Sequence, residues 1–187
     1  VFGLYDLIGI DLMKDVLASF KKELQENDPF MDVVAPHPLV EKLLEKGFNG
    51  NKGPGGFYQT TIVDDDEIVK AMNTSDMSYY DFDKVDLEIA RRVEKEGINV
   101  LLDDDSEYGR YAFAVLAKII NYSAFCIPEV SSKVTDIDDA LRMGCNWNEG
   151  PFELLNEYGL TKFAQRLQDE KQEVPELLKT MIGLKQE

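Results

Sequence analysis

Few side chains in this sequence could perform chemistry. The only histidine, His37, lies between Pro36 and Pro38, and no carboxylate motif accompanies it, so a structural or surface role is favoured over general-base catalysis. The two cysteines, Cys126 and Cys145, provide neither a disulfide scaffold nor a zinc cluster, and we interpret them as small buried hydrophobic residues. We therefore expect no catalytic residue in this segment.

Several patterns could be interpreted as ligand sites. Residues 50–56, Gly-Asn-Lys-Gly-Pro-Gly-Gly, could cradle a phosphate, but they match neither the dinucleotide nor the P-loop spacing, so a packed turn is favoured. The aspartate runs 64–66 and 103–105 lack the ligand spacing and glycine of a calcium loop, which favours solvated acidic turns. Trp147 and Phe152 could line an acyl pocket, but a core position is favoured. We expect no metal site and no cofactor-binding residue here.

The composition indicates an acidic globular chain. Its 187 residues include 20 Lys and Arg against 36 Asp and Glu, a formal net charge of −16, and 44% of the residues are hydrophobic. This content is enough for one domain or two small ones. The negative charge argues against nucleic-acid and anionic-membrane partners. Apolar runs are too short to span a membrane, no signal-peptide pattern is present, and the low cysteine content favours a cytoplasmic location.

Hydrophobic periodicity predicts an all-α fold with at most a minor β-hairpin near 57–70. In the first part we expect a helix over 12–24 with Asp11 as its N-cap. A short helix that begins at Pro38 and is followed by Gly47 should come next.

Further along, we expect a helix ended by Gly97 and a long buried helix over 111–127 closed by Pro128. The remaining helices are one capped by Asp136 with Gly144 at C′, one from Pro151 to Gly159, one capped by Thr161 and one begun by Pro175. Residues 60–107 contain 15 acidic and 5 basic residues, a local net charge of −10. We interpret them as an acidic connector between residues 1–59 and 108–187.

An internal repeat links the two parts of the chain. The segments from Phe2 to Ile10 and from Phe152 to Leu160 share the pattern Phe-x-Leu-x-(Asp/Asn)-x-x-Gly-(Ile/Leu) at a constant offset of 150 residues. A proline-initiated helix then follows in both copies, and a Gly-x-Lys triplet follows that helix, at 50–52 and 183–185. Both ends therefore fall inside a repeating unit. We expect a fragment whose first copy has its equivalents of the 111–127 and 136–144 helices upstream of Val1.

The segment from Ile137 to Leu154 strongly resembles the signature of 3-hydroxyacyl-CoA dehydrogenase C-terminal domains, (I)-D-x-A-(M/L)-x-x-G-x-x-x-x-x-G-P-F-E-L. The matching residues include Gly144, Gly150, Pro151, Phe152 and Glu153.

Two further blocks carry the same resemblance. The segment from Phe2 to Asp11 is similar to the family's F-x-L-x-D-x-x-G-(L/I)-D. The segment from Gly50 to Tyr58 is similar to its ending G-x-K-x-G-x-G-F-Y, through Lys52, Gly53, Gly56, Phe57 and Tyr58. Asn121 and its neighbours resemble the long bacterial members that carry two such domains in tandem.

The resemblance implies helical domains of the 6-phosphogluconate-dehydrogenase C-terminal type, namely the end of a first domain at 1–59 and a truncated second at 108–187. In that family an upstream Rossmann domain binds NAD, and the helical domain shapes the acyl-CoA cleft and forms the dimer contact. The reaction is reversible oxidation of the 3-hydroxyl of an acyl-CoA in fatty-acid β-oxidation. Long members also carry an enoyl-CoA hydratase-like region.

The family's catalytic groups are not matched in this segment. Its His–Glu pair belongs to the Rossmann domain, and Phe113 stands where the second copy should have the substrate-contacting Asn, while Asn121 matches a downstream Asn. We therefore predict a non-catalytic second copy and a fragment that alone neither binds NAD nor oxidises substrate. The signature residues would be structural or cleft-lining.

Two alternatives remain. The segment could be a non-catalytic helical assembly or dimerisation module of a multidomain β-oxidation protein, because duplication supplies pseudo-twofold surfaces. A helical C-terminal domain of the NAD-dependent dehydrogenases that act on sugar acids shares the architecture but lacks the Gly-Pro-Phe-Glu-Leu block.

Overall fold

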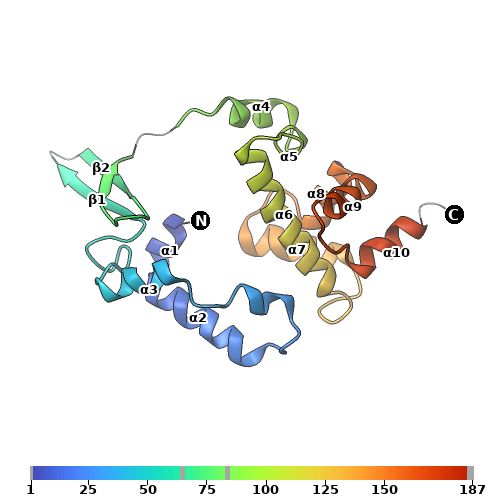
Figure 1. Cartoon of the computed structure of the whole chain (residues 1–187), viewed down its shortest axis with the longest axis horizontal. Coiled ribbons are helices and arrows are strands. Elements are labelled where there is room, and N and C mark those ends of the chain that lie inside the picture. Colours follow the sequence, from blue (N-terminus) through green and yellow to red (C-terminus); the bar gives the residue numbers. More distant parts are fainter. Residues whose placement is uncertain (1, 64–65, 83–84, 185–187) are drawn as a thin grey trace. The chain divides into compact units, whose positions relative to one another are not determined.

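A computed structural model of the chain describes residues 2–63, 66–82 and 85–184 (Figure 1). Its contacts divide the chain into two units, residues 1–85 and 86–187. The described residues form ten α-helices, one 3-10 helix and three short strands. The predicted helical fold with a minor β-hairpin is therefore confirmed, and each unit is described by itself below.

Unit 1 begins with two consecutive helices, α1 (Phe2–Ile8) and α2 (Ile10–Glu23), separated by Gly9 alone. A 3-10 helix η1 (Pro29–Asp32) and helix α3 (Pro38–Glu45) follow. The predicted N-cap Asp11 is wrong, because Gly9 is the N-cap and Asp11 lies in the first turn. Gly9 has φ +104°, a backbone conformation that residues other than glycine rarely adopt. The proline start of α3 is confirmed.

A small antiparallel sheet completes unit 1, in the order β1 (Tyr58–Val63), β2 (Asp66–Met72) and β3 (Tyr79–Asp81). Tyr58 pairs with Ala71, and Met72 pairs with Tyr79. The first two strands are the predicted hairpin, whereas β3 was not predicted. Residues 64–65 of the predicted acidic turn lie outside the described residues. The core of the unit is Ile10, Leu43, Phe57 and Met72.

Unit 2 is entirely helical over its described residues. Its elements are α4 (Glu88–Glu96), α5 (Asn99–Leu102), α6 (Glu107–Phe125), α7 (Val134–Cys145), α8 (Pro151–Tyr158), α9 (Leu160–Asp169) and α10 (Glu176–Leu184). Helix α6 has more buried residues than any other described helix, as predicted for the 111–127 segment. It begins earlier, at Glu107, because the hydroxyl of Ser106 accepts a hydrogen bond from the Gly109 amide and caps it.

The segment expected as a connector is shared between the two units. Residues 60–85 lie in unit 1 and include most of its sheet, whereas 86–107 lie in unit 2 and include α4 and α5. Leu102, at the end of α5, is fully buried in the core of unit 2. Among the described acidic residues of the segment, Glu67 lies on β2 and Glu88, Glu94 and Glu96 lie on α4.

Three predicted helix boundaries in unit 2 are wrong. Helix α7 begins at Val134, so Asp136 lies in its first turn, and it ends beyond Gly144, with Asn146 in the left-handed conformation as its C-cap. Asn tolerates this conformation better than most residues, which allows the helix to continue through Gly144. Helix α9 begins at Leu160 with Gly159 as its N-cap, in place of Thr161.

Candidate functional site

The signature block of unit 2 folds around one buried carboxylate, Asp138 on α7. Its Oδ1 accepts a hydrogen bond of 2.8 Å from the backbone N–H of Phe152, in the first turn of α8. Gly150, the N-cap of α8, has no side chain that could accept this bond. Asp138 therefore caps α8 from a neighbouring helix and joins α7 to α8.

Gly150 is required by this contact. A Cβ atom at position 150 would lie 2.3 Å from the Asp138 Cβ and 2.4 Å from its Cα. Gly144 differs, because a Cβ there would meet no atom within 4 Å. Of the two signature glycines, only Gly150 is explained by close packing, and nothing in the structure explains a glycine at 144.

Glu153 and Pro151 complete the start of α8. Pro151 occupies the first helical position and is buried, where its missing N–H leaves no orphan donor. The Glu153 carboxylate accepts a hydrogen bond of 2.7 Å from the Gly150 N–H and forms an ion pair of 3.2 Å with Arg142 on α7. The side chain of Phe152 is buried in the core, as predicted.

A second buried carboxylate, Asp6 on α1, organises the signature residues of unit 1. Its Oδ1 accepts the N–H of Phe57 at 2.9 Å and its Oδ2 accepts the N–H of Tyr58 at 2.7 Å. Gly56 packs against the same group, because a Cβ there would lie 2.0 Å from Oδ1. The Phe57 ring lies 4.7 Å from the Phe2 ring between centroids. Asp6 therefore fixes the start of β1 on α1.

The glycine-rich segment 50–56 folds as a packed turn. The N–H groups of Gly50, Gly53 and Gly56 donate to the carbonyls of Gly55, Gly50 and Tyr58, and the N–H of Asn51 donates to the carbonyl of Asp6. These amides are therefore not free to bind a phosphate. The segment also leads into a strand rather than a helix. A polar groove of about 310 Å³ beside it includes Glu67, which would repel an anion.

The remaining unit 1 signature residues make contacts within the unit. Lys52 is half-exposed and forms an ion pair with Asp11 at 3.6 Å between Nζ and Oδ1. A Cβ at Gly53 would lie 3.0 Å from the carbonyl oxygen of Gly47, so the turn is close to its steric limit there. The ring of Tyr58 contacts Phe82 edge to face, with centroids 5.6 Å apart.

Phe113, at the position where the family's substrate-contacting Asn would lie, is fully buried in α6. Its ring contacts those of Tyr158 and Phe163, with centroid distances of 6.1 and 5.6 Å. The Arg166 guanidinium stacks on it at 3.8 Å. Asn121 lies two turns further along α6, and its buried Oδ1 has no hydrogen-bond partner among the described residues. Phe113 and its neighbours fill this region of unit 2.

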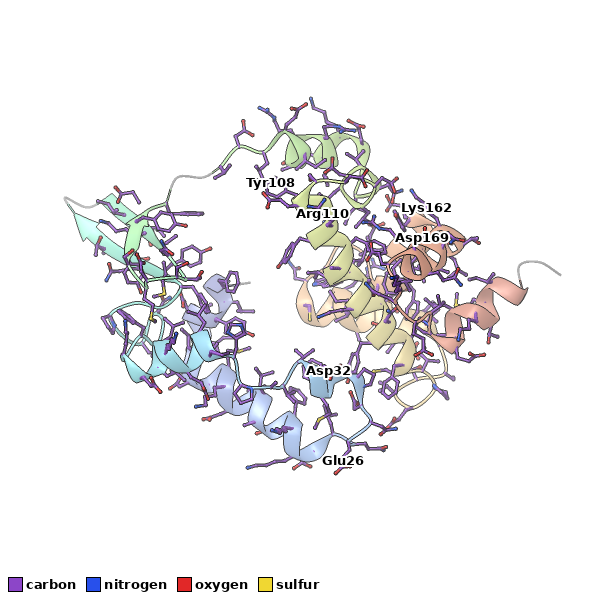
Figure 2. All side chains as sticks on the ribbon, viewed as in Figure 1. Glu26, Asp32, Tyr108, Arg110, Lys162 and Asp169 are labelled. Atoms are coloured by element: carbon purple, nitrogen blue, oxygen red, sulfur yellow. The ribbon has the colours of Figure 1, made fainter. Side chains whose placement is uncertain are left out.

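Charged side chains attach α9 to the preceding helices of unit 2. Lys162 pairs with Asp103 at 2.5 Å and lies over the Tyr158 ring at 4.4 Å, and Arg166 also donates to the Leu102 carbonyl. Figure 2 labels Lys162 on α9 and Tyr108 at the start of α6. The predicted acidic run 103–105 thus contributes a specific contact through Asp103.

The other candidate residues have ordinary roles. His37 is exposed and caps α3, because its Nδ1 accepts the Leu39 N–H at 3.2 Å. The prediction that both cysteines are buried is wrong, because Cys126 is half-buried and Cys145 is exposed near the end of α7. Over the described ranges, no group of three or more His, Cys, Asp or Glu residues could hold a metal ion. No helix in this part of the chain is long and apolar enough to cross a membrane.

Burial shifts the pKa of two groups in these clusters. Burial raises the pKa of Asp138, although the N–H of Phe152 partly opposes the change. Burial and the nearby Asp6 charge raise the pKa of Tyr79, whose hydroxyl donates to the Gly56 carbonyl at 2.7 Å. Both groups act as structural hydrogen-bonding partners.

Sequence reasoning did not single out Asp6 and Asp138 as site residues. The available signal was their place in the family blocks, each accompanied by a glycine that could approach the carboxylate closely, Gly56 or Gly150. Their hydrogen-bond partners lie 51 and 14 residues further along the chain, so local spacing could not identify them.

The repeat is present in the backbone as well as in the sequence. The N–H of Gly9 donates to the Tyr5 carbonyl at 2.9 Å, and the N–H of Gly159 donates to the Leu155 carbonyl at 3.0 Å. Gly9 and Gly159 have φ of +104° and +99°. The later Gly-x-Lys match does not persist, because Gly50 lies in a turn and Gly183 lies inside α10. The structural repeat therefore comprises the helix–glycine–helix element and a later helix at a proline, α3 from Pro38 and α10 directly after Pro175.

Comparisons with known proteins match the chain to one family. A family model described as 3-hydroxyacyl-CoA dehydrogenase, C-terminal domain, matches residues 1–60 and 109–185. No solved structure is significantly similar to the chain.

Curated relatives come from two bacterial genera. A Rickettsia felis protein named "Putative fatty acid oxidation complex trifunctional enzyme" is 36% identical over 155 residues, which is 83% of this chain and 21% of that protein. A Bacillus subtilis protein named "Probable 3-hydroxyacyl-CoA dehydrogenase" is 24% identical over 186 residues, 97% of this chain and 23% of that protein. The chain thus spans about a fifth of the length of these relatives. The family model matches most of the chain, so the chain belongs to the 3-hydroxyacyl-CoA dehydrogenase C-terminal domain family.

Proposed function

We propose that this chain is the C-terminal helical part of an NAD-dependent 3-hydroxyacyl-CoA dehydrogenase. The whole protein would oxidise the 3-hydroxyl of an acyl-CoA to a 3-oxo group in cytoplasmic fatty-acid β-oxidation. The match to the family model over both repeats carries this proposal. The fatty acid oxidation named in the Rickettsia relative supports it. The chain would help to shape the acyl-CoA cleft and form contacts between subunits.

The described residues do not fit NAD. A Rossmann site needs parallel strands and a glycine loop that opens a helix, whereas the sheet of unit 1 is antiparallel and its glycine loop leads into β1. We therefore assign NAD binding and the general base to an upstream Rossmann domain of the whole protein. An enoyl-CoA hydratase-like region is a further proposed partner, in keeping with the trifunctional name of the Rickettsia relative.

Unit 2 would support the fold without contacting the reacting atoms. Phe113 is fully buried at the position where the family's substrate-contacting Asn would lie, and the Arg166 guanidinium stacks on its ring. A phenyl ring cannot hold a substrate oxygen by hydrogen bonding. The signature residues Gly150, Pro151 and Glu153 then act by joining α7 to α8.

A two-part assay tests this function. The purified chain and the whole protein that contains it are each mixed with acetoacetyl-CoA and NADH, and NADH consumption is followed. We expect turnover by the whole protein and none by the chain. Turnover by the chain alone would overturn the assignment of NAD binding to another domain. A folded whole protein with no turnover would overturn the dehydrogenase proposal.

An assembly module is the second candidate function. It is favoured by the apolar side chains that α1 and α2 expose, including Phe2, Leu4 and Val16. Light scattering on the chain, combined with titration of acetoacetyl-CoA, distinguishes the two candidates. Self-association without acyl-CoA affinity supports assembly, whereas micromolar binding supports a share of the substrate cleft.

A further inference from the structure

The glycine turn of unit 1 contains the only Asn-Gly pair in the sequence, Asn49-Gly50. The pair follows α3, and residues 51–57 lead from it into β1 (Figure 1). An asparagine followed by glycine is especially prone to spontaneous deamidation, because glycine has no side chain to hinder attack by its own backbone nitrogen. The turn therefore contains a chemically reactive pair.

Deamidation needs neither an enzyme nor a cofactor. The backbone nitrogen of Gly50 gives up its proton and attacks Cγ of Asn49, and the side-chain nitrogen leaves as ammonia, so that a succinimide ring forms. Water then adds to one of the two ring carbonyls and opens the ring to aspartate or isoaspartate. The reaction requires a Gly50 N–H that is free to react and an Asn49 side chain that can turn toward it.

Both reacting groups are occupied in the folded turn. The Gly50 N–H donates to the Gly55 carbonyl at 2.9 Å, and Gly50 is buried, so a base in water cannot reach this proton. The Oδ1 of Asn49 accepts the N–H of Asp11 at 2.9 Å, which holds the Asn49 side chain against α2. Attack on Cγ therefore requires the turn to open.

Packing explains why the reactive pair has these two residues. Gly50 has φ +68°, and a Cβ atom there would lie 2.4 Å from both the Cα and the carbonyl oxygen of Asp6. A larger residue would push α1 away from the turn. Hydrogen bonding from the Asn49 side chain lowers the pKa of Asp11, so this amide also stabilises a neighbouring carboxylate. The pair is thus part of the contact that joins the turn to α1 and α2.

We propose that Asn49 is a site of spontaneous deamidation, blocked in the folded turn and reached only when the turn opens. This inference does not depend on the proposed activity. Refolding does not reverse the reaction, so the product records each opening in which it formed. The product carries a carboxylate beside Asp11 in place of the amide that donated to it, and like charges then oppose closure of the turn.

The experiment compares deamidation with hydrogen exchange at the same nitrogen. The full chain and a capped synthetic peptide of residues 47–52 are incubated in one buffer, and mass spectrometry follows the mass increase at Asn49. Exchange of the Gly50 N–H in the full chain is measured by NMR in the same buffer. Because both reactions need the same opening, the chain should deamidate more slowly than the peptide by the factor that protects the Gly50 N–H, at least about tenfold.

Asn51, which is followed by Lys52, is the internal reference in both samples and should stay intact while Asn49 reacts in the peptide. Equal rates for Asn49 in the chain and the peptide overturn the proposal. A chain in which Asn49 reacts while the Gly50 N–H stays protected overturns it as well. So does a chain in which Gly50 exchanges freely while Asn49 stays intact.

Asp6→Ala tests the opening of the turn. The Asp6 carboxylate accepts the N–H groups of Phe57 and Tyr58, so its removal should loosen the turn and speed both reactions by the same factor. Asp138→Ala is the matched control, because it removes the buried carboxylate of unit 2 while unit 1 keeps its own core. It should leave both rates unchanged.

If Asp6→Ala unfolds the chain, Asn49 should react at the rate of the peptide, so the test stays valid. No acceleration in Asp6→Ala, or an equal acceleration in Asp138→Ala, would show that opening of this turn does not control the reaction, and the proposal would be overturned.

Discussion

Helices α1 and α8 share their sequence pattern and the hydrogen bond that ends them at a glycine, yet their apolar residues are buried to very different extents. The shared pattern determines backbone conformation, because glycine at φ near +100° interrupts the helix and allows the next one to begin. Burial depends on contacts from other elements, which the seven or eight residues of each helix do not encode. Repeats of similar sequence can therefore have different packing energies.

The buried carboxylates show a second difference between the units. In unit 1, Asp6 projects from α1 and fixes the glycine turn and the start of β1. In unit 2, the counterpart of Asp6 is Asn156, which is exposed, and the buried carboxylate is Asp138, which fixes the other end of the corresponding helix. The two units thus hold their matching helices through different ends.

The largest expected effect is Gly150→Ala. The added Cβ would overlap Asp138 at its Cα and Cβ, so α7 and α8 must separate, and we expect a loss of about 4 kcal/mol in unfolding free energy. Gly144→Ala is the matched control, because it adds a methyl group to an exposed helix position and should stabilise by about 0.5–1 kcal/mol. Fluorescence of Trp147, which packs on the core of unit 2, reports denaturant unfolding. Similar midpoints for both variants would contradict the proposed role of Gly150.

Asp6→Ala should have the next largest effect on the free energy of unfolding. It leaves the N–H groups of Phe57 and Tyr58 without their acceptor, at a cost of about 3 kcal/mol. Asn156→Ala, at the matched exposed position of unit 2, should change stability by less than about 0.5 kcal/mol. Amide hydrogen exchange in β1 measures the first effect and Trp147 fluorescence the second. Equal effects would show that the repeats use this position in the same way.

Leu4→Ala and Leu154→Ala truncate a leucine at matched positions of α1 and α8. Leu154 is buried, so its truncation should cost about 2 kcal/mol. Leu4 is mostly exposed, so its truncation should cost less than about 1 kcal/mol. Hydrogen exchange within each helix provides the measurement. A cost at Leu4 as large as that at Leu154 would show that its face is already covered in solution.

How far the sequence predicts this fold depends on the range of the interactions involved. Proline starts, glycine ends and apolar periodicity predicted most of the helices and the hairpin, because these signals act within a few residues. The N-caps at Asp11 and Thr161 were wrong, because both helices instead follow a glycine directly. The amide of Asp11 finds its acceptor in the Asn49 side chain, 38 residues away. Acceptors at such distances cannot be read from local spacing.

The candidate site follows the same rule. The family blocks named Gly150 and Phe152 in unit 2 and Gly56 and Phe57 in unit 1. They did not identify Asp138 and Asp6, the carboxylates that contact these two pairs. Gly144 belongs to the same signature as Gly150, but a Cβ atom there would meet no atom within 4 Å. A motif in the sequence therefore indicates which segments pack, whereas the atoms responsible emerge only when the helices are assembled.

The smallest expected effect is the pH dependence contributed by Asp138, whose pKa is raised by burial from its ordinary value of 3.8. The folded chain then binds this proton more tightly than the unfolded chain does. Stability contributed by the protonated group is present below the ordinary pKa and is lost as pH rises through the folded-state pKa. Asp138→Asn keeps an acceptor oxygen for the N–H of Phe152 but cannot ionise.

Unfolding of both proteins, followed by Trp147 fluorescence between about pH 3 and pH 6, isolates this contribution, because every other titrating group is common to the two. The stability of the wild-type chain relative to Asp138→Asn should fall as pH rises across this range. A constant difference would show that Asp138 keeps its ordinary pKa. A difference that grows in favour of the wild type would mean that hydrogen bonding from α8 outweighs burial, so that the carboxylate stabilises the α7–α8 junction as an anion.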